Sequence, residues 1–273
     1  MGAFHDSPER RDAVIAALVL DRSRNATEEL AALGIVKAPD QFAVESGLDP
    51  ALVYLLRAAF VDPIPNVRGL RESLSSIKVG GNTKSIPHQW LIAVWWTMSP
   101  SLRSRVSDQA LLHAGDNVVE MHRRILAGEK IAAKEWRTAR RVELTTDIQS
   151  AATRTILASA WDLSEMPRAV GDVLATVAPL ALAEAEHAIA WGALDEQTHR
   201  SAEAVYSAKL IEIQDLAAEQ QKLARERIVE AHQAENRDLY ARAEARNEKT
   251  WSLLRGWRDA MQGALTSLFR AMP

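Results

Sequence analysis

The sequence predicts an all-α fold: a multi-helical bundle with a long, charged, coiled-coil-like helix near the C-terminus. Three observations predict it. The chain runs 63 residues between Gly192 and Gly256 without glycine or proline. This run is rich in Ala, Glu, Arg, Gln and Lys, which favour helices. Alanine is abundant throughout while runs of β-branched residues are short, and apolar residues near the C-terminus recur at helical spacing.

Composition excludes several classes of protein. Hydrophobic residues make up 47% of the 273, too many for a disordered chain. Cysteine is absent, which excludes disulfides, thiolate metal sites and cysteine nucleophiles. The net charge of −3 gives no general attraction to nucleic acids or anionic membranes. The polar start does not resemble a signal peptide, and the most apolar stretch, Trp90–Met98, is too short to span a bilayer. We therefore expect a cytoplasmic protein without a transmembrane segment.

The N-terminal third is expected to form short helices. Apolar patterning predicts helices over Ala13–Leu20 and Ala26–Gly34, the second ending at a C-cap glycine. Helices over Gln41–Ser46 and Ala51–Phe60 follow, and Asp49-Pro50 is a strong start signal for the second. Two adjacent glycines within Lys78–Pro87 predict a loop and a boundary between lobes.

The segment 41–57 has small and apolar residues at the spacing of a helical pair joined by a tight turn. These residues are Ala43, Gly47, Leu48, Val53 and Leu56. In this spacing the segment resembles the helix-turn-helix superfamily, which implies a small tri-helical unit and, in DNA-binding members, a recognition helix. That helix needs Arg, Lys, Asn or Gln to contact bases. Here it offers only Arg57, so we predict a structural role with Val53, Leu56 and Phe60 buried.

The middle of the chain is rich in Ala and Trp, and the positions of its glycines and prolines predict a series of helices. They cover Trp90–Met98, Leu102–His113, Asn117–Leu126 and the stretches that begin at Pro167 and Pro179. Ile131–Trp161 contains no glycine or proline and is rich in Ala and Thr. In general character this region resembles bacterial helical immunity and defence-associated proteins. The resemblance carries no motif, and so it assigns no residue a role.

Charge is distributed unevenly in this middle region. Residues 102–142 hold 9 basic and 5 acidic residues, whereas residues 143–203 hold 3 and 10. Within Lys130–Arg141, four cations recur at steps of three or four and share one helical face: Lys130, Lys134, Arg137 and Arg141. The face suits a nucleic-acid surface, but a solvated face or a dock for the acidic segment is the interpretation that we favour.

Two Glu-x-x-His pairs place a carboxylate and an imidazole on one side of a helix, as in carboxylate metal sites of helical bundles. They are Glu184…His187 and Glu196…His199. Such a site needs facing helices and two further glutamates, and nothing in the sequence marks either. We therefore predict no metal site and no cofactor.

The glycine-free run carries a thin apolar stripe whose spacing, close to 3.6–3.7 residues per turn, keeps one face over 33 residues. We predict that residues 202–250 are mostly helical and make an inter-helix contact, within the chain or with a partner, through Ile213, Ala217, Ala224 and Ile228. The terminal helix carries a second stripe that includes Trp251 and Trp257, which could anchor an interface or a membrane.

These features predict three regions: 1–80, 85–200 and 201–273. The function that we expect is non-enzymatic: a helical interaction protein that associates with a protein partner or with itself. One alternative is a DNA-binding regulator with an N-terminal helix-turn-helix and a helical dimerisation region. A carboxylate/histidine metalloenzyme is a distant third.

Overall fold

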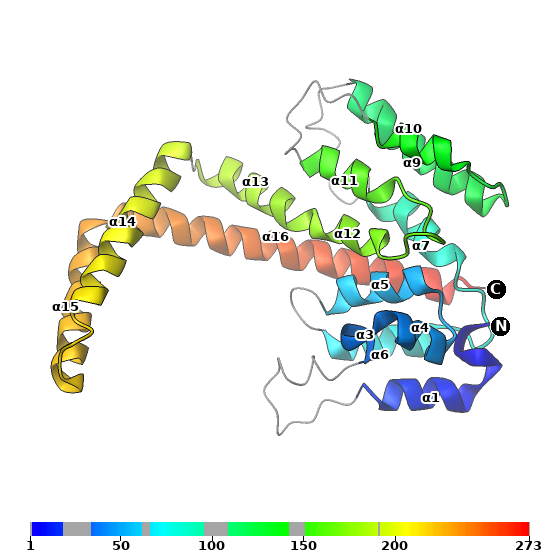
Figure 1. The fold of residues 1–273 in the computed structure, drawn as a ribbon, viewed down its shortest axis with the longest axis horizontal. Coiled ribbons are helices and arrows are strands. Elements are labelled where there is room, and N and C mark those ends of the chain that lie inside the picture. Colours follow the sequence, from blue (N-terminus) through cyan, green and yellow to red (C-terminus); the bar gives the residue numbers. More distant parts are fainter. Residues whose placement is uncertain are drawn as a thin grey trace. The chain divides into compact units, whose positions relative to one another are not determined.

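The computed structural model describes residues 2–18, 34–61, 66–95, 109–141, 151–190 and 192–272. Every regular element within these ranges is a helix, which confirms the all-α prediction (Figure 1). Backbone contacts divide the chain into two compact units. Unit 1 holds residues 1–178 and 255–273, and unit 2 holds residues 179–254. The sequence placed the boundaries elsewhere, near residues 80 and 200.

Unit 1 begins with short helices that their capping residues define. They are η1 (Ala3–Asp6), α1 (Pro8–Ala16), α3 (Gly34–Lys37), α4 (Pro39–Ser46), α5 (Pro50–Phe60) and α6 (Val67–Ser76). The Ser7 side chain accepts a hydrogen bond from the Arg10 amide at the start of α1, and Asp49 accepts one from the Ala51 amide at the start of α5. The expected start of α5 is therefore confirmed.

Helix α5 is the centre of this half of unit 1. Its residues Leu52, Val53, Leu55 and Leu56 have no exposed surface, and Phe60 is 1% exposed. The helix packs against α3, α4, α6, α7 and α12, and Figure 1 shows it lying beside α4 and α6. Burial on several sides accounts for its apolar sequence.

The second half of unit 1 is a further set of helices: α7 (Ser85–Trp90), the π-helical turn η2 (Leu91–Trp95), α9 (Gln109–Leu126), α10 (Ala133–Ala139), α11 (Ala151–Ser159) and α12 (Ala169–Ala175). Helix α9 ends where Gly128 adopts a φ of 88°, a conformation that glycine adopts without strain. Helix α10 packs back on α9. The helices expected over Ala26–Gly34 and Leu102–His113 lie largely outside the described residues.

The glycine-containing loop at residues 78–84 is held within unit 1. The Ala3 amide donates to the Gly81 carbonyl at 3.0 Å, and the Gly80 amide donates to the Ala3 carbonyl at 2.9 Å. The Asp49 amide donates to the Thr83 hydroxyl at 3.0 Å. The loop that the sequence marks as a lobe boundary thus joins the N-terminal segment to the start of α5.

The end of the last helix, α16 (Arg237–Arg270), also belongs to unit 1. Met261, Leu265 and Phe269 are buried at steps of four. The Gln262 amide nitrogen donates to the Ala59 carbonyl at 2.8 Å, and the Gln262 oxygen accepts from Asn66 at 2.8 Å. These bonds join residues about 200 positions apart, which explains why a reading of local sequence placed the C-terminal helix in a separate region.

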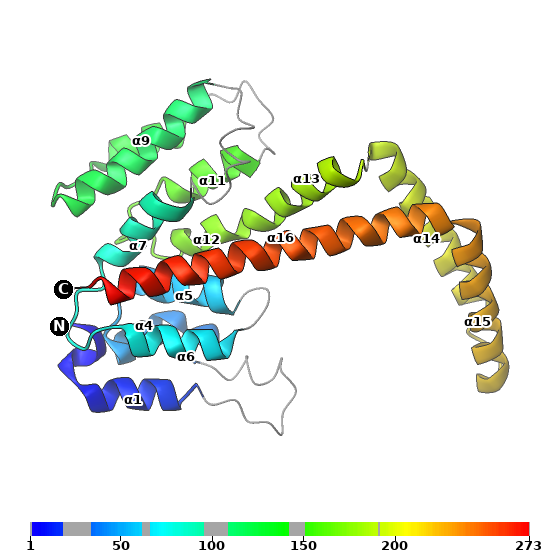
Figure 2. The same cartoon turned by 180° about the vertical axis from the view of Figure 1, so that it is seen from behind.

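Unit 2 is built from α13 (Val177–Ile189), α14 (Ala193–Glu212), α15 (Ala218–Glu235) and the first part of α16. The glycine-free run is therefore three helices. The first break is a turn over residues 213–217, and the second is at Asn236, whose side chain donates to the His232 carbonyl at 3.1 Å. Helices α14 and α15 pack against each other as a hairpin (Figures 1 and 2).

Candidate functional site: an association surface on the α14–α15 hairpin

The hairpin has almost no apolar core of its own. Among the described residues of unit 2, the buried apolar side chains are those of Ala181, Ala185 and Leu239. Two of the three are alanines, which bury little surface. Apolar burial is the main favourable contribution to folding. Polar interactions must therefore contribute a larger share of the stability of the hairpin than of the stability of unit 1.

A hydrogen-bonded group of side chains joins the three helices at the base of the hairpin. The Tyr240 hydroxyl on α16 donates to the Glu203 carboxylate on α14 and bonds to His232 Nε2 on α15. We call Glu203, His232 and Tyr240 the hydroxyl network. Burial, and then the bond to Glu203, raises the pKa of the Tyr240 hydroxyl above its usual value. Tyr240 therefore stays protonated and keeps donating at neutral pH.

Aromatic contacts and ion pairs support the hydroxyl network. The Tyr206 ring stacks on His232 with ring centroids 4.9 Å apart, and the His199 ring lies 5.2 Å from that of Tyr240. Arg242 pairs with Asp195 at 2.8 Å, and Arg246 pairs with Glu186 at 3.0 Å. The acidic segment of the sequence is thus paired in part with arginines of α16.

Large apolar side chains lie on the surface of unit 2. Of the nine large hydrophobic residues that are exposed in the described part of the chain, seven lie in unit 2: Leu182, Leu194, Val205, Ile211, Leu216, Leu223 and Trp251. Ile211 is 63% exposed, Leu216 42% and Leu223 57%. These three flank or lie in the turn between α14 and α15, and we call them the apolar tip. Single exposed apolar residues are common, whereas several in one region of a protein are a reason to look for an interaction surface there.

Of the six residues that the sequence singled out, four lie on the hairpin and two lie on α16. Ile213 is half-buried at the end of α14, and Ala217 is exposed at the N-cap of α15. Ala224 and Ile228 are half-buried on α15. On α16, Trp251 is 39% exposed in unit 2, whereas Trp257 is half-buried and belongs to unit 1. Their role in association stays a prediction.

Sequence reasoning missed the hydroxyl network and most of the exposed apolar residues. His232, Asn236 and Tyr240 recur at steps of four, a spacing that places them on one helical face. That spacing was a usable signal. The partner carboxylate of Glu203 lies 37 residues from Tyr240, and no local pattern points to it.

A groove of about 950 Å³ lies where α15 meets α16. Small side chains line it together with His199 and Tyr240, and its charged residues are Glu230, Arg237 and Glu244. The groove is broad and carries charges of both signs, features of a docking surface more than of an enclosed small-molecule site.

The two Glu-x-x-His pairs lie on different helices, with Glu184 and His187 on α13 and Glu196 and His199 on α14. Glu196 forms an ion pair with Arg200, and His199 contacts the Tyr240 ring. Within the described ranges, no group of three or more metal-ligating side chains is positioned to hold an ion.

The helix-turn-helix-like unit has the local geometry that the sequence indicates. Helix α4 ends at Gly47, which has a φ of 67°, and α5 follows. Val53, Leu56 and Phe60 are buried, as predicted. A helix whose side chains fill a core cannot present those same side chains to base edges. The structural interpretation of the unit is therefore supported.

No helix among the described residues is long and apolar enough to cross a bilayer. No known protein family, curated protein or solved structure matches the chain.

Proposed function

We propose that the protein is a non-enzymatic interaction protein that associates through the α14–α15 hairpin. The observation that carries the proposal is the contrast within unit 2, which buries three apolar side chains and exposes seven large ones among its described residues. Covering the apolar tip would remove from water apolar surface worth about 25 cal/mol per Å². The hydroxyl network holds the hairpin, so the tip is presented in advance of binding.

The partner that we propose is a second copy of the chain. Helix α15 carries three basic residues, Lys222, Arg225 and Arg227, interleaved with the acidic residues Glu219, Glu226, Glu230 and Glu235. Two such helices pairing antiparallel about a twofold axis can set cations of one copy against carboxylates of the other. A helix of nearly balanced charge also avoids the repulsion that a strongly charged helix meets in its own copy.

The test is the molar mass of the purified chain by light scattering over a range of concentrations. We expect a dimer, and we expect Ile211→Ser with Leu223→Ser to shift it toward monomer. Both residues are exposed, so the pair should leave the fold intact. The matched control is Val44→Ser with Leu126→Ser, because these are the two exposed large hydrophobic residues described in unit 1. A monomeric wild-type chain, or equal loss of mass in both variants, would contradict the proposal.

A further inference from the structure

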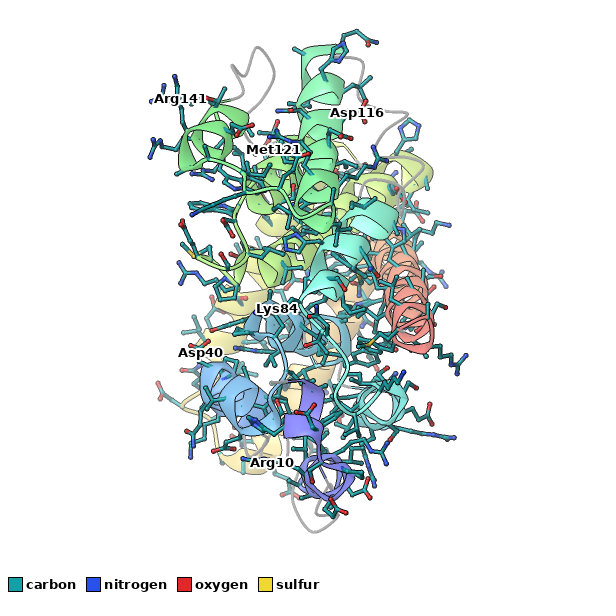
Figure 3. All side chains as sticks on the ribbon, turned by 90° about the vertical axis from the view of Figure 1, so that its right-hand side faces the viewer. Arg10, Asp40, Lys84, Asp116, Met121 and Arg141 are labelled. Atoms are coloured by element: carbon teal, nitrogen blue, oxygen red, sulfur yellow. The ribbon has the colours of Figure 1, made fainter. Side chains whose placement is uncertain are left out.

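The four cations that the sequence places on one face lie around α10 in unit 1, and all four are exposed: Lys130, Lys134, Arg137 and Arg141. We call them the basic face. Figure 3 shows the Arg141 side chain pointing outward from the end of α10. The opposite side of the segment is anchored in the protein, because Ile131, Trp136 and Ala139 are buried.

The basic face has no acidic partner among the described residues. Residues 120–141 hold seven basic and three acidic side chains. The three carboxylates are already bound: Glu120 pairs with Arg123, and both Glu129 and Glu135 pair with Arg124. A fifth cation, Arg140, lies 3.7 Å over the Trp161 ring and donates to the Ala160 carbonyl. Among the described residues, four positive charges therefore have no carboxylate bound to them.

Four carboxylates of the acidic segment, all in unit 2, are bound to side chains other than those of the basic face. Glu186 and Asp195 bind Arg246 and Arg242, Glu196 binds Arg200, and Glu203 binds Tyr240. These four carboxylates therefore do not pair with the basic face, contrary to the expected docking of that face on the acidic segment. In the part of the chain that the structure describes, no carboxylate is bound to the basic face.

We infer that the basic face binds the phosphate backbone of double-stranded nucleic acid without reading its sequence. Lys134 lies on α10 and Arg141 lies two residues past its end. At a helical rise of 1.5 Å per residue, the seven steps between them correspond to about 10 Å. That length matches three phosphate steps of one strand at about 3.4 Å each. Residues 130–141 contain no Asn or Gln for bidentate contacts to adenine, so the contacts position a duplex without selecting bases.

An anionic membrane is the competing polyanion, and the side chains around the basic face argue against it. Stable binding to a bilayer surface adds buried apolar side chains to the electrostatic attraction. The large apolar side chains of this segment, Ile131 and Trp136, face the interior of the protein. The exposed residues between the cations are small, Ala132, Ala133 and Thr138.

The test is fluorescence anisotropy of the full chain with a labelled 30-base-pair duplex of arbitrary sequence at about 50 and 150 mM salt. If four phosphates are neutralised, the logarithm of affinity falls with the logarithm of salt with a slope of about −3.6. The affinity should then fall about 50-fold across this range. Lys134→Glu with Arg137→Glu should weaken binding at least tenfold at the lower salt and reduce the slope.

The matched control is Arg71→Glu with Lys78→Glu, which changes the net charge equally at two exposed positions of unit 1. It should change affinity less than twofold, as should Arg57→Ala on α5. Lys134→Gln with Arg137→Gln gives a milder loss and guards against misfolding of the charge reversal. The inference would be overturned if the chain did not bind the duplex, or if the variant and the control lost affinity equally. It would also be overturned if the chain bound vesicles with 30% phosphatidylserine more tightly than the duplex and the Lys134→Glu with Arg137→Glu variant weakened that binding.

Discussion

The two units differ in what holds them together. In unit 1, α5 packs against several other helices, and its Leu and Val residues and Phe60 are buried. In unit 2, polar bonds among Glu203, His232 and Tyr240 join the helices, while large apolar residues lie on the surface. The described part of unit 2 thus folds with less apolar burial than unit 1 and leaves more large apolar side chains exposed. This difference is the basis of our proposal that unit 2 carries an association surface.

The largest effect that we expect follows from truncating the unit 1 core. Leu56→Ala should lower the free energy of unfolding by about 2–5 kcal/mol, since it leaves a cavity in a fully buried site. Leu223→Ala makes the same change on α15 at a residue that is 57% exposed and should cost less than about 0.5 kcal/mol. Urea unfolding of both variants checks this. Similar losses would remove the contrast between the units.

The stability of unit 1 should fall in acid because it contains a histidine pair in which His122 is buried and His88 is half-buried. Nδ1 of His88 lies 2.9 Å from Nδ1 of His122, and His122 Nε2 donates to the Ser159 carbonyl at 3.0 Å. Burial lowers the pKa of His88 to about 4. Burial, and then the charge of His88, lowers the pKa of His122 to about 3.

Because both histidine pKa values are lowered in the folded protein, the stability of unit 1 decreases as the pH falls. The unfolded chain takes up protons below pH 6.5 while the folded one stays neutral, so stability is complete above pH 6.5 and falls as the pH drops toward 4. Each histidine contributes a slope of about 1.4 kcal/mol per pH unit. Urea midpoints between pH 7.5 and 4.5 measure it. His122→Asn should lower the free energy of unfolding at pH 7.5 and should make that free energy depend less steeply on pH below 6.5. An unchanged slope of stability against pH would contradict this account.

Removing the Tyr240 hydroxyl should loosen unit 2 selectively. Tyr240→Phe leaves the Glu203 carboxylate and His232 Nε2 without the oxygen that bridges them, at a cost of about 1–3 kcal/mol. Hydrogen exchange should quicken in α14 and α15 and stay unchanged in α5. Tyr206→Phe is the control, because it keeps the ring that stacks on His232. Equal effects in α5 would show that the network does not act locally.

A moderate change in fold stability should follow from charges placed in the half-buried side of the hairpin. Ile213→Glu with Ile228→Glu places two carboxylates at half-buried positions, where they lose part of their hydration. The pair should weaken assembly or lower the melting temperature by a few degrees. Light scattering and thermal melting measure the two effects. Unchanged molar mass and unchanged melting temperature together would show that these residues contribute to neither.

Local sequence signals predicted the parts of the structure that depend on neighbouring residues. Asp49-Pro50 marked the start of α5, and Gly47 marked the turn before it. The turn at residues 213–217 could not be predicted, because it contains neither glycine nor proline and its neighbours favour helix.

The surface properties depend on distant residues, and this limits what the sequence alone can predict. The apolar stripe of the sequence identified Ile213, Ala224 and Ile228, which are half-buried, whereas Leu216 and Leu223 lie off that stripe and are exposed. Whether a charge is compensated is also a long-range property. Arg242, not the basic face, binds Asp195, and 47 residues separate them.

Hydrogen exchange at two protein concentrations tests the central claim most directly, because it locates the contact as well as detecting it. At high concentration we expect slower exchange in peptides that cover the apolar tip, residues 211–223, and unchanged exchange in α5 and α6. Ile211→Ser with Leu223→Ser should abolish the difference. Exchange that is independent of concentration, or protection confined to unit 1, would contradict association through the hairpin.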